Sequence, residues 1–385
     1  MENFTYQNPV KILFGKGQIA SIAGEIPAGA KILVTYGGGS IKKNGVYDQV
    51  KAALEGRQWI EFGGIEPNPH YETCMKAAEL ARKEAVDFLL AVGGGSVLDG
   101  TKFIAVAACF KKSDPWNVVT GAAHAEAALP LGCVLTLPAT GSEMNTNAVI
   151  TRESTKEKLP FSSPLIYPQF SVLDPETTFS LPPRQISNGI VDAFVHTMEQ
   201  YMTFPVNSPL QDRMAEAIFL TLIEEGPKTL ANPTNYAARA NLVWSATMAL
   251  NGLIAVGVPQ DWATHMIGHE LTALHGLDHA QSLAVVAPSL LKVKSDVKRE
   301  KLLQFAERVW GIREGTPEER IEKGIEKMRA FFESVGAPTH LSAYGLGTEV
   351  AAEVAGRLQK RGWLGLGERQ DVTPDQVKQI LLQAA

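Results

Sequence analysis

The sequence has few cysteines, no long apolar run and no excess of positive charge. Its three cysteines, Cys74, Cys109 and Cys133, lack metal-type spacing, so we expect free thiols and a reducing, cytoplasmic setting. Charges, glycines or prolines interrupt every apolar stretch before about 18 residues, so no membrane-spanning helix is expected. The first residues do not form a basic segment followed by an apolar one, so we expect no secretory signal.

The charge balance also argues against nucleic acid as a partner. The 385 residues include 36 Lys and Arg against 41 Asp and Glu, which gives a formal net charge of -5. No basic stripe is present that could follow a phosphate backbone. Hydrophobic residues make up 45% of the chain, enough for the two domains that this length favours.

Hydrophobic periodicity divides the chain into two halves. In the first half, compact apolar strands alternate with amphipathic helices, which is typical of a parallel sheet covered on both faces. We expect strands at 31–36, 57–62, 87–92 and 133–137, and helices at 41–54, 71–85 and 97–109. The second half predicts helices at 185–202, 209–225, 235–254, 258–275, 280–294, 298–310 and 316–335. The predicted domains are an α/β dinucleotide-binding domain, 1–178, and an all-helical metal-binding and catalytic domain, 179–385.

A glycine-rich turn at 93–96 joins a buried strand directly to a helix. Gly94, Gly95 and Ser96 would let the backbone approach a phosphate, whose charge the helix N-terminus favours. Asp99 follows in the first turn of that helix. The turn lacks the GxGxxG dinucleotide pattern, so a tight turn without a ligand is the alternative interpretation.

Two further turns follow strands of the same predicted sheet. Thr140 and Ser142 lie in a hydroxyl-rich turn, although turns of this composition are common. Gly37, Gly38, Gly39 and Ser40 follow the first apolar strand, with Lys42 and Lys43 just beyond. An NAD-selective site normally places an acid here to bind the ribose 2′-hydroxyl, and none is present. The sequence therefore favours NADP, unless both lysines are merely solvated.

Two clusters of potential metal ligands lie in the helical half. Asp192 and His196 are four residues apart, so a helix places both on one face. Four of the eight histidines, His265, His269, His275 and His279, fall within 15 residues. One carboxylate with imidazoles suits Fe(II) or Zn(II) equally. Spacing favours His265 with His269 but cannot choose among the four, and each residue alone could be an ordinary buried histidine or helix-start carboxylate.

These motifs resemble the iron-containing (group III) alcohol dehydrogenase family over essentially the whole chain. The resemblance rests on GGGSVLDGTK at 93–102, LPATGSE at 137–143, NGIVDAFVHTMEQY at 188–201 and HMIGHELTALHGLDHAQSLA at 265–284. The segments YGGGSIKKNGV and FGGIEPNP are similar to the NADPH-dependent aldehyde reductase and butanol dehydrogenase branch. The resemblance implies a Rossmann-like domain followed by a helical domain, in the dehydroquinate synthase-like architecture, and a homodimer.

The resemblance also implies roles for individual residues. The implied metal ligands are Asp192, His196, His265 and His279, of which Asp192 and His265 also count as catalytic. His269 corresponds to a histidine near the nicotinamide that relays protons, and His275 to a peripheral position. The implied cofactor-binding residues are Gly94, Gly95, Ser96, Asp99, Thr136, Thr140, Ser142 and Lys158, with Gly37, Gly38, Gly39 and Ser40 at the adenosine end.

The implied activity is reversible hydride transfer between NADPH and small to medium aldehydes, which gives primary alcohols. A polyol dehydrogenase or a dehydroquinate synthase-like lyase would share this architecture. Apolar residues around the histidines, such as Met266 and Leu271, favour an uncharged aldehyde over an anionic lyase substrate. A protein that binds metal and nucleotide without catalysis is the alternative from another class.

Overall fold

The computed structural model describes all residues, 1–385, and divides into two compact units. The sheet unit contains residues 7–181 and 233–247, and the helical unit contains residues 1–6, 182–232 and 248–385. The predicted domain boundary between 178 and 179 stays a prediction. Among the helices, none combines the length and the apolar character needed to cross a membrane.

The sheet unit is built on six parallel strands in the order β1-β8-β5-β4-β2-β3. A separate antiparallel hairpin pairs β6 with β7. The six strands are β1 (Lys11–Phe14), β2 (Ile32–Tyr36), β3 (Trp59–Phe62), β4 (Phe88–Gly94), β5 (Leu131–Leu137) and β8 (Phe170–Leu173), and the hairpin is β6 (Asn147–Arg152) with β7 (Glu157–Ser162). The parallel α/β fold class expected for this half is confirmed.

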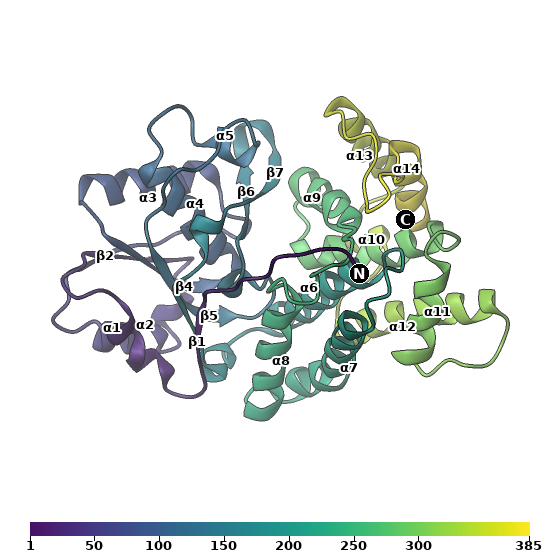
Figure 1. Ribbon diagram of the computed structural model, residues 1–385, viewed down its shortest axis with the longest axis horizontal. Helices are drawn as coiled ribbons and strands as arrows, with labels where there is room; N and C mark the ends of the chain where they lie inside the picture. The colour runs from purple at the N-terminus through teal and green to yellow at the C-terminus, as the bar shows by residue number, and fades with distance from the viewer. The chain divides into compact units, whose positions relative to one another are not determined.

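Helices cover both faces of the sheet because side chains alternate along each strand. Ile32 and Val34 of β2 share one buried core with Val46 and Val50 of α2. The next residue, Thr35, points to the other face, where its hydroxyl lies 2.6 Å from that of Thr101 in α4. Figure 1 shows the two helical layers on either side of the strands. The helices are α1 (Ile22–Glu25), α2 (Val46–Ala53), α3 (Tyr71–Lys83), α4 (Gly95–Cys109) and α5 (Trp116–Val119).

The strand order reverses between β2 and β4. From β2 the chain moves outward to β3 and then returns to β4 on the opposite side of β2. Parallel sheets of this kind bind ligands outside the carboxyl ends of the strands at such a reversal. The glycine-rich turns at 37–40 and 93–96 follow these two neighbouring strands, and the turn at 138–142 follows β5, which pairs with β4. All three predicted cofactor turns therefore lie along one edge of one sheet.

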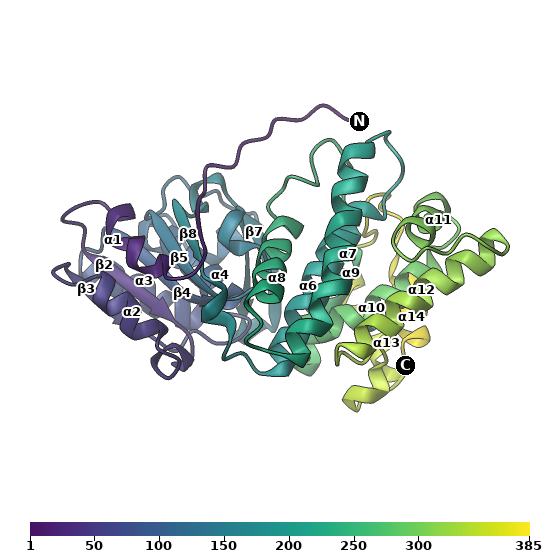
Figure 2. The ribbon, with the colours of Figure 1, turned by 90° about the horizontal axis from the view of Figure 1, so that it is seen from below.

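The helical unit is organised around α6, which is buried along most of its length. Helix α6 packs against α7 and α10, and α10 also packs against α9, α12 and α14. Figure 2 shows α6 and α7 side by side. The helices of this half are α6 (Pro183–Tyr201), α7 (Pro209–Ala231), α8 (Tyr236–Ala249), α9 (Ala263–His275), α10 (His279–Val293), α11 (Arg299–Arg308), α12 (Pro317–Ser334), α13 (Glu349–Lys360) and α14 (Pro374–Gln383), with most of α8 in the sheet unit.

Two predicted helices begin later than expected. The helix expected at 41–54 starts at Val46, because Gly45 adopts a left-handed φ of 81° and the preceding residues form a short 3-10 turn. The helix expected at 258–275 starts at Ala263, after Trp262 adopts a left-handed φ of 63°. Left-handed backbone cannot continue a right-handed helix, so each residue ends the preceding segment.

Phe194 anchors α6 in the core of the helical unit. Its ring centroid lies 4.6 Å from that of Phe219, 5.3 Å from Phe332 and 5.6 Å from Phe331. Phe194→Ala should lower the free energy of unfolding by about 3–5 kcal/mol, because it leaves a cavity in a closely packed aromatic cluster. Phe194→Leu keeps most of the side-chain volume, so it should lower the free energy of unfolding by less than the alanine variant does. Denaturant titration measures both, and a loss below about 1 kcal/mol for the alanine variant would contradict this packing.

Candidate functional site

Helix α6 contributes the first pair of donor side chains. Asp192 and His196 lie one turn apart, and both are nearly inaccessible to solvent. The Nε2 atom of His196 is 3.5 Å from Oδ1 of Asp192. A buried carboxylate needs a compensating partner, and imidazoles or a cation can provide it.

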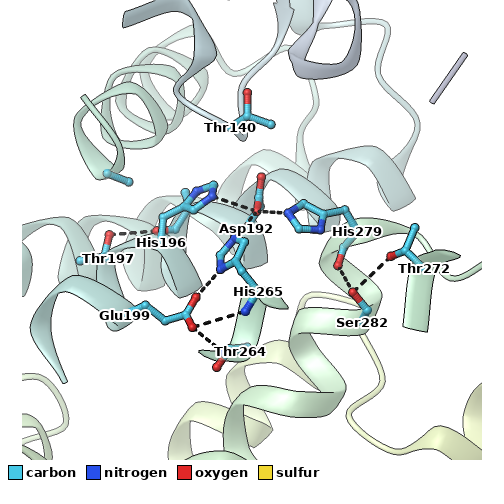
Figure 3. Close-up of polar contacts among 12 residues, drawn as sticks. Thr140, Asp192, His196, Thr197, Glu199, Thr264, His265, Thr272, His279 and Ser282 are labelled. Carbon is cyan, nitrogen blue, oxygen red and sulfur yellow. Dashed lines mark hydrogen bonds and ion pairs between the residues drawn. The ribbon is translucent and has the colours of Figure 1, made fainter. Parts of the chain in front are cut away.

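Two histidines from other helices complete the cluster. His265 lies in the first turn of α9, and His279 is the first residue of α10, which begins after a capping box formed by Asp278 and Gln281. Their Nε2 atoms lie 3.8 and 3.5 Å from Oδ1 of Asp192. One donor atom from each of Asp192, His196, His265 and His279 lies within 4.8 Å of the other three. Figure 3 shows the four side chains pointing toward one another.

This donor set fits a divalent cation. Ligands about 2.1 Å from a tetrahedral cation lie about 3.4 Å from one another, close to the spacing of the imidazole nitrogens from Asp192. Nε2 of His265 is buried and lies 3.8 Å from Oδ1 of Asp192, so it is placed to coordinate a cation at the cluster. Imidazole with carboxylate serves both Fe(II) and Zn(II), so the donor chemistry does not distinguish these metals.

Glu199, which sequence reasoning did not single out, contacts the far side of His265. Its Oε2 atom is hydrogen-bonded to Nδ1 of the His265 ring, and its Oε1 accepts from the backbone N–H of Thr264 at 2.6 Å. Burial works to lower the pKa of His265, but the negative charges of Glu199 and Asp192 outweigh it and raise that pKa to about 9. Glu199 lies three residues after His196 on α6, so helical spacing is the signal that could have revealed it.

The other two clustered histidines lie outside the four-donor group. His269 is buried, with its ring centroid 5.4 Å from that of His279 and 6.2 Å from that of His265. His275 lies at the end of α9, where its Nε2 is 3.1 Å from a carboxylate oxygen of Glu353 on α13. The structure therefore brings His269 close to the cluster and places His275 in a separate ion pair.

In the sheet unit, the turn at 93–96 leads directly into α4. Gly94 precedes this helix and Gly95 is its first residue. A Cβ atom on Gly95 would lie 2.4 Å from Cγ2 of Thr140, so only glycine allows this close approach between two of the predicted cofactor turns. The hydroxyl of Ser96 accepts a hydrogen bond from the backbone N–H of Asn68 at 3.2 Å. The first N–H groups of α4, which have no acceptor within the helix, are suited to a phosphate.

Asp99 connects three parts of the predicted cofactor site. Its Oδ1 accepts from the hydroxyl of Ser142 at 2.6 Å, and its Oδ2 accepts from the backbone N–H of Val149 at 2.9 Å. Burial raises the pKa of Asp99, and the positive charge of Lys102 opposes that rise. The ammonium of Lys102 in turn donates to both the backbone and the side-chain oxygen of Asn145, at 2.9 and 3.0 Å. Asp99 thus holds the Ser142 turn against α4.

A hydrogen bond between Lys158 and Asn68 is a second connection within the predicted cofactor site. Lys158 is buried on β7, and its ammonium donates to the side-chain oxygen of Asn68 at 2.8 Å. Asn68 adopts a left-handed φ of 56° between two prolines, an unusual backbone conformation of the kind that clusters at functional sites. Sequence analysis did not single out Asn68. Thr136, also predicted to bind cofactor, lies at the end of β5 and is mostly buried.

The turn after β2 carries no acidic residue. Gly38 has open space where a side chain would lie, because a Cβ there would meet no atom within 4 Å. The ammonium of Lys42 lies 4.8 and 4.7 Å from the ring centroids of Tyr36 and Tyr47 and 2.9 Å from a carboxylate oxygen of Glu61. Hydrogen bonding with Tyr36 and Glu61 raises the pKa of Lys42, which keeps it positively charged at neutral pH.

If the turn at 93–96 binds NADPH, as the family resemblance implies, Gly95→Ala should weaken that binding by about tenfold or more, since overpacking costs about 1–3 kcal/mol and Thr140 is stiff at χ1. Fluorescence titration with NADPH measures the change. Gly24→Ala is the matched control, because a Cβ at this helical glycine would meet nothing within 4 Å. Equal affinity in both variants would contradict the close packing of Gly95 on Thr140 as a determinant of cofactor binding.

Comparison with known proteins agrees with this geometry. Residues 9–175 match the family described as iron-containing alcohol dehydrogenase, and residues 186–385 match its C-terminal domain family. An Escherichia coli (strain K12) relative named NADPH-dependent aldehyde reductase YqhD is 59% identical over 382 residues, 99% of each chain. A Bacillus subtilis (strain 168) relative named probable NADH-dependent butanol dehydrogenase 1 is 42% identical over 370 residues, 95% of each chain. The crystal structure of E. coli K-12 YqhD has a TM-score of 0.98 at 58% identity, covering 100% of this chain and 99% of that chain.

The chain therefore belongs to the iron-containing alcohol dehydrogenase family. It is an oxidoreductase of that family, as the motifs predicted, and the expected fold class is confirmed as well. The two relatives differ in the nicotinamide cofactor that their names give. Whether this chain prefers NADPH or NADH therefore depends on its own residues.

Proposed function

We propose that the protein is a metal-dependent aldehyde reductase and alcohol dehydrogenase that uses NADPH. It interconverts small to medium aldehydes and primary alcohols by reversible hydride transfer. The observation that carries this proposal is the convergence of Asp192, His196, His265 and His279 on one point. The name of the E. coli relative, at 59% identity over the full length, supports the choice of aldehyde and NADPH.

The four converging side chains would hold one cation, either Fe(II) or Zn(II). A divalent cation bound there supplies Lewis-acid polarisation of a carbonyl oxygen. Asp192 contributes the negative charge of the set, and burial keeps water from competing for the donors. The buried ring of His269, next to that of His279, would take part in moving the proton that the product oxygen requires.

The cofactor would bind at the edge of the sheet where the turns at 37–40, 93–96 and 138–142 lie. The backbone at Gly94, Gly95 and Ser96, which begins α4, would bind the pyrophosphate. Thr140 and Ser142 would contact the cofactor from the neighbouring turn, together with Thr136 at the end of β5. Lys158 would approach the ribose from β7. NADPH itself supplies the hydride, and these residues orient it.

The preference for NADPH over NADH would come from the turn after β2. Gly37, Gly38, Gly39 and Ser40 leave space and a hydroxyl where an acid would repel a 2′-phosphate. Lys42 and the exposed Lys43 add positive charge beside the turn, although Glu61 offsets part of the charge of Lys42. We therefore expect NADPH to be preferred rather than exclusive.

Three further features belong to the proposal. We propose a homodimer, as the family resemblance implies, and a cytoplasmic location. We also propose that residues 1–178 and 179–385 act as the cofactor domain and the metal-binding, catalytic domain. Size measurement by light scattering and limited proteolysis near residue 178 test the first and the last of these.

Steady-state kinetics with butanal tests the proposed function. NADPH should be oxidised in step with the formation of butan-1-ol, with kcat/KM for NADPH above that for NADH. No consumption of either nucleotide in metal-containing protein would contradict the proposal and favour a lyase or a non-catalytic binding protein. Turnover with polyols but not with butanal would favour a polyol dehydrogenase.

A further inference from the structure

One buried carboxylate contacts the side of the His265 ring that faces away from the four-donor cluster. Glu199 lies on α6, seven residues after Asp192 and three after His196, so the three side chains follow one stripe of the helix. Asp192 and His196 point into the cluster, whereas Glu199 reaches α9 one turn further along (Figure 3). The side chain of Glu199 is only 1% exposed. A carboxylate removed from water to this degree requires strong hydrogen-bond donors.

The groups that donate hydrogen bonds to the side chain of Glu199 lie at the start of α9. Its Oε1 atom accepts from the backbone N–H of Thr264 at 2.6 Å and, more weakly, from that of His265 at 3.4 Å. These N–H groups belong to the first turn of the helix, where no intrahelical acceptor exists. A negative charge at a helix N-terminus is also favoured by the helix dipole. One oxygen of Glu199 therefore holds the backbone that carries His265.

The other oxygen of Glu199 holds the ring of His265. It is hydrogen-bonded to Nδ1, which fixes the proton of the neutral ring on that nitrogen. Nε2 is then left as the atom with a free lone pair, and it faces Asp192 at 3.8 Å. The short contact with Glu199 therefore sets the rotation of the ring, since Nε2 makes only the longer contact with Asp192.

We propose that Glu199 is a positioning residue that fixes the tautomer and orientation of His265 for cation binding. This inference rests on the proposed cation site. Glu199 touches neither substrate nor cofactor in this account, and it acts only through His265. Carboxylates hydrogen-bonded to a ligating histidine typically strengthen metal affinity by about 10–100-fold.

Glu199→Gln tests the proposal with Zn(II) as the probe. The Thr264 backbone N–H and the Nδ1 of His265 are bound by different oxygens of Glu199. In glutamine one of these oxygens becomes an NH2 group, so one of the two donors loses its acceptor and faces another donor. We expect the dissociation constant for Zn(II), measured by competition with a chromophoric chelator, to rise by about 10–100-fold. The dissociation constant for NADPH, measured by fluorescence, should stay within about twofold of wild type.

Glu216→Gln is the matched control. Glu216 is another buried carboxylate of the helical unit, but it accepts from Tyr201, Gln304 and Arg308 and contacts no member of the cluster. Its replacement should leave Zn(II) affinity unchanged. A fall in Zn(II) affinity as large as that of Glu199→Gln would show a general stability effect and overturn the proposal.

The alternative role for Glu199 is that of a helix cap alone. In that case Glu199→Gln would lower the unfolding temperature of the metal-free protein while Zn(II) affinity stayed the same, and this result would overturn the proposal. If Glu199→Gln does not fold, Glu199→Asp tests the same claim, because its shorter side chain withdraws the acceptor from Nδ1 and should also weaken Zn(II) binding. Wild-type protein that binds no Zn(II) or Fe(II) would instead overturn the cation site itself.

Discussion

Replacing His265 by alanine is expected to abolish metal binding and aldehyde reduction together. The substitution removes one of four donors and leaves Asp192 with two imidazoles. A bound cation stabilises the charge on a reacting oxygen by several kcal/mol, and a loss of about 4 kcal/mol corresponds to about 10³-fold in rate. Metal content by elemental analysis and kcat/KM with butanal measure the two effects in the same preparation.

His275→Ala is the matched control for this experiment. His275 lies on the same helix, ten residues further on, but pairs with Glu353 instead of joining the cluster. We expect it to keep the metal and near-normal turnover. Retained metal and near-normal activity in His265→Ala would contradict the assignment of His265 as a ligand.

Replacing Gly38 by aspartate is expected to reverse the preference between NADPH and NADH. The backbone at Gly38 is not in the left-handed region, and a Cβ would meet no atom within 4 Å, so the fold should accept the new side chain. A carboxylate facing the 2′-phosphate should lower kcat/KM for NADPH by about 100-fold, or about 2.7 kcal/mol, because facing like charges cost several kcal/mol. The same carboxylate can accept from the free 2′-hydroxyl of NADH.

Gly38→Asn separates charge from size in this test. Asparagine fills a similar volume without the negative charge, so it should reduce NADPH use much less than aspartate. The ratio of kcat/KM values for the two cofactors is the measurement. A Gly38→Asp variant that still prefers NADPH as strongly as wild type would show that the turn after β2 does not set the preference.

The fold of the first half was readable because its strands are nearly continuous apolar runs that end at glycine clusters. The four predicted strands are present as β2, β3, β4 and β5. Strands β1 and β8, each of four residues, were not predicted. The hairpin was missed because β7 contains Pro160, a residue that normally argues against a strand. Pairing with a neighbour, not local preference, stabilises these elements.

The residue types of the site could be predicted, but not which of these residues lie together in the structure. Spacing alone favoured His265 with His269, since both lie on α9. The structure brings His279 into the group instead, because α9 ends at the left-handed Gly276 and α10 then starts at His279. Only the family resemblance selected this set from the sequence. Glu199 and Asn68 stayed hidden because their roles depend on contacts with residues far away in the chain.

The most direct test of the account is NADPH oxidation with butanal before and after chelation, with the metal content measured in parallel. We expect rapid oxidation that is lost with the metal and restored by added zinc or ferrous ion. The ion that restores more activity identifies the better cofactor. Full turnover in protein shown to contain no metal would contradict the central claim, because Asp192, His196, His265 and His279 would then have no cation to hold.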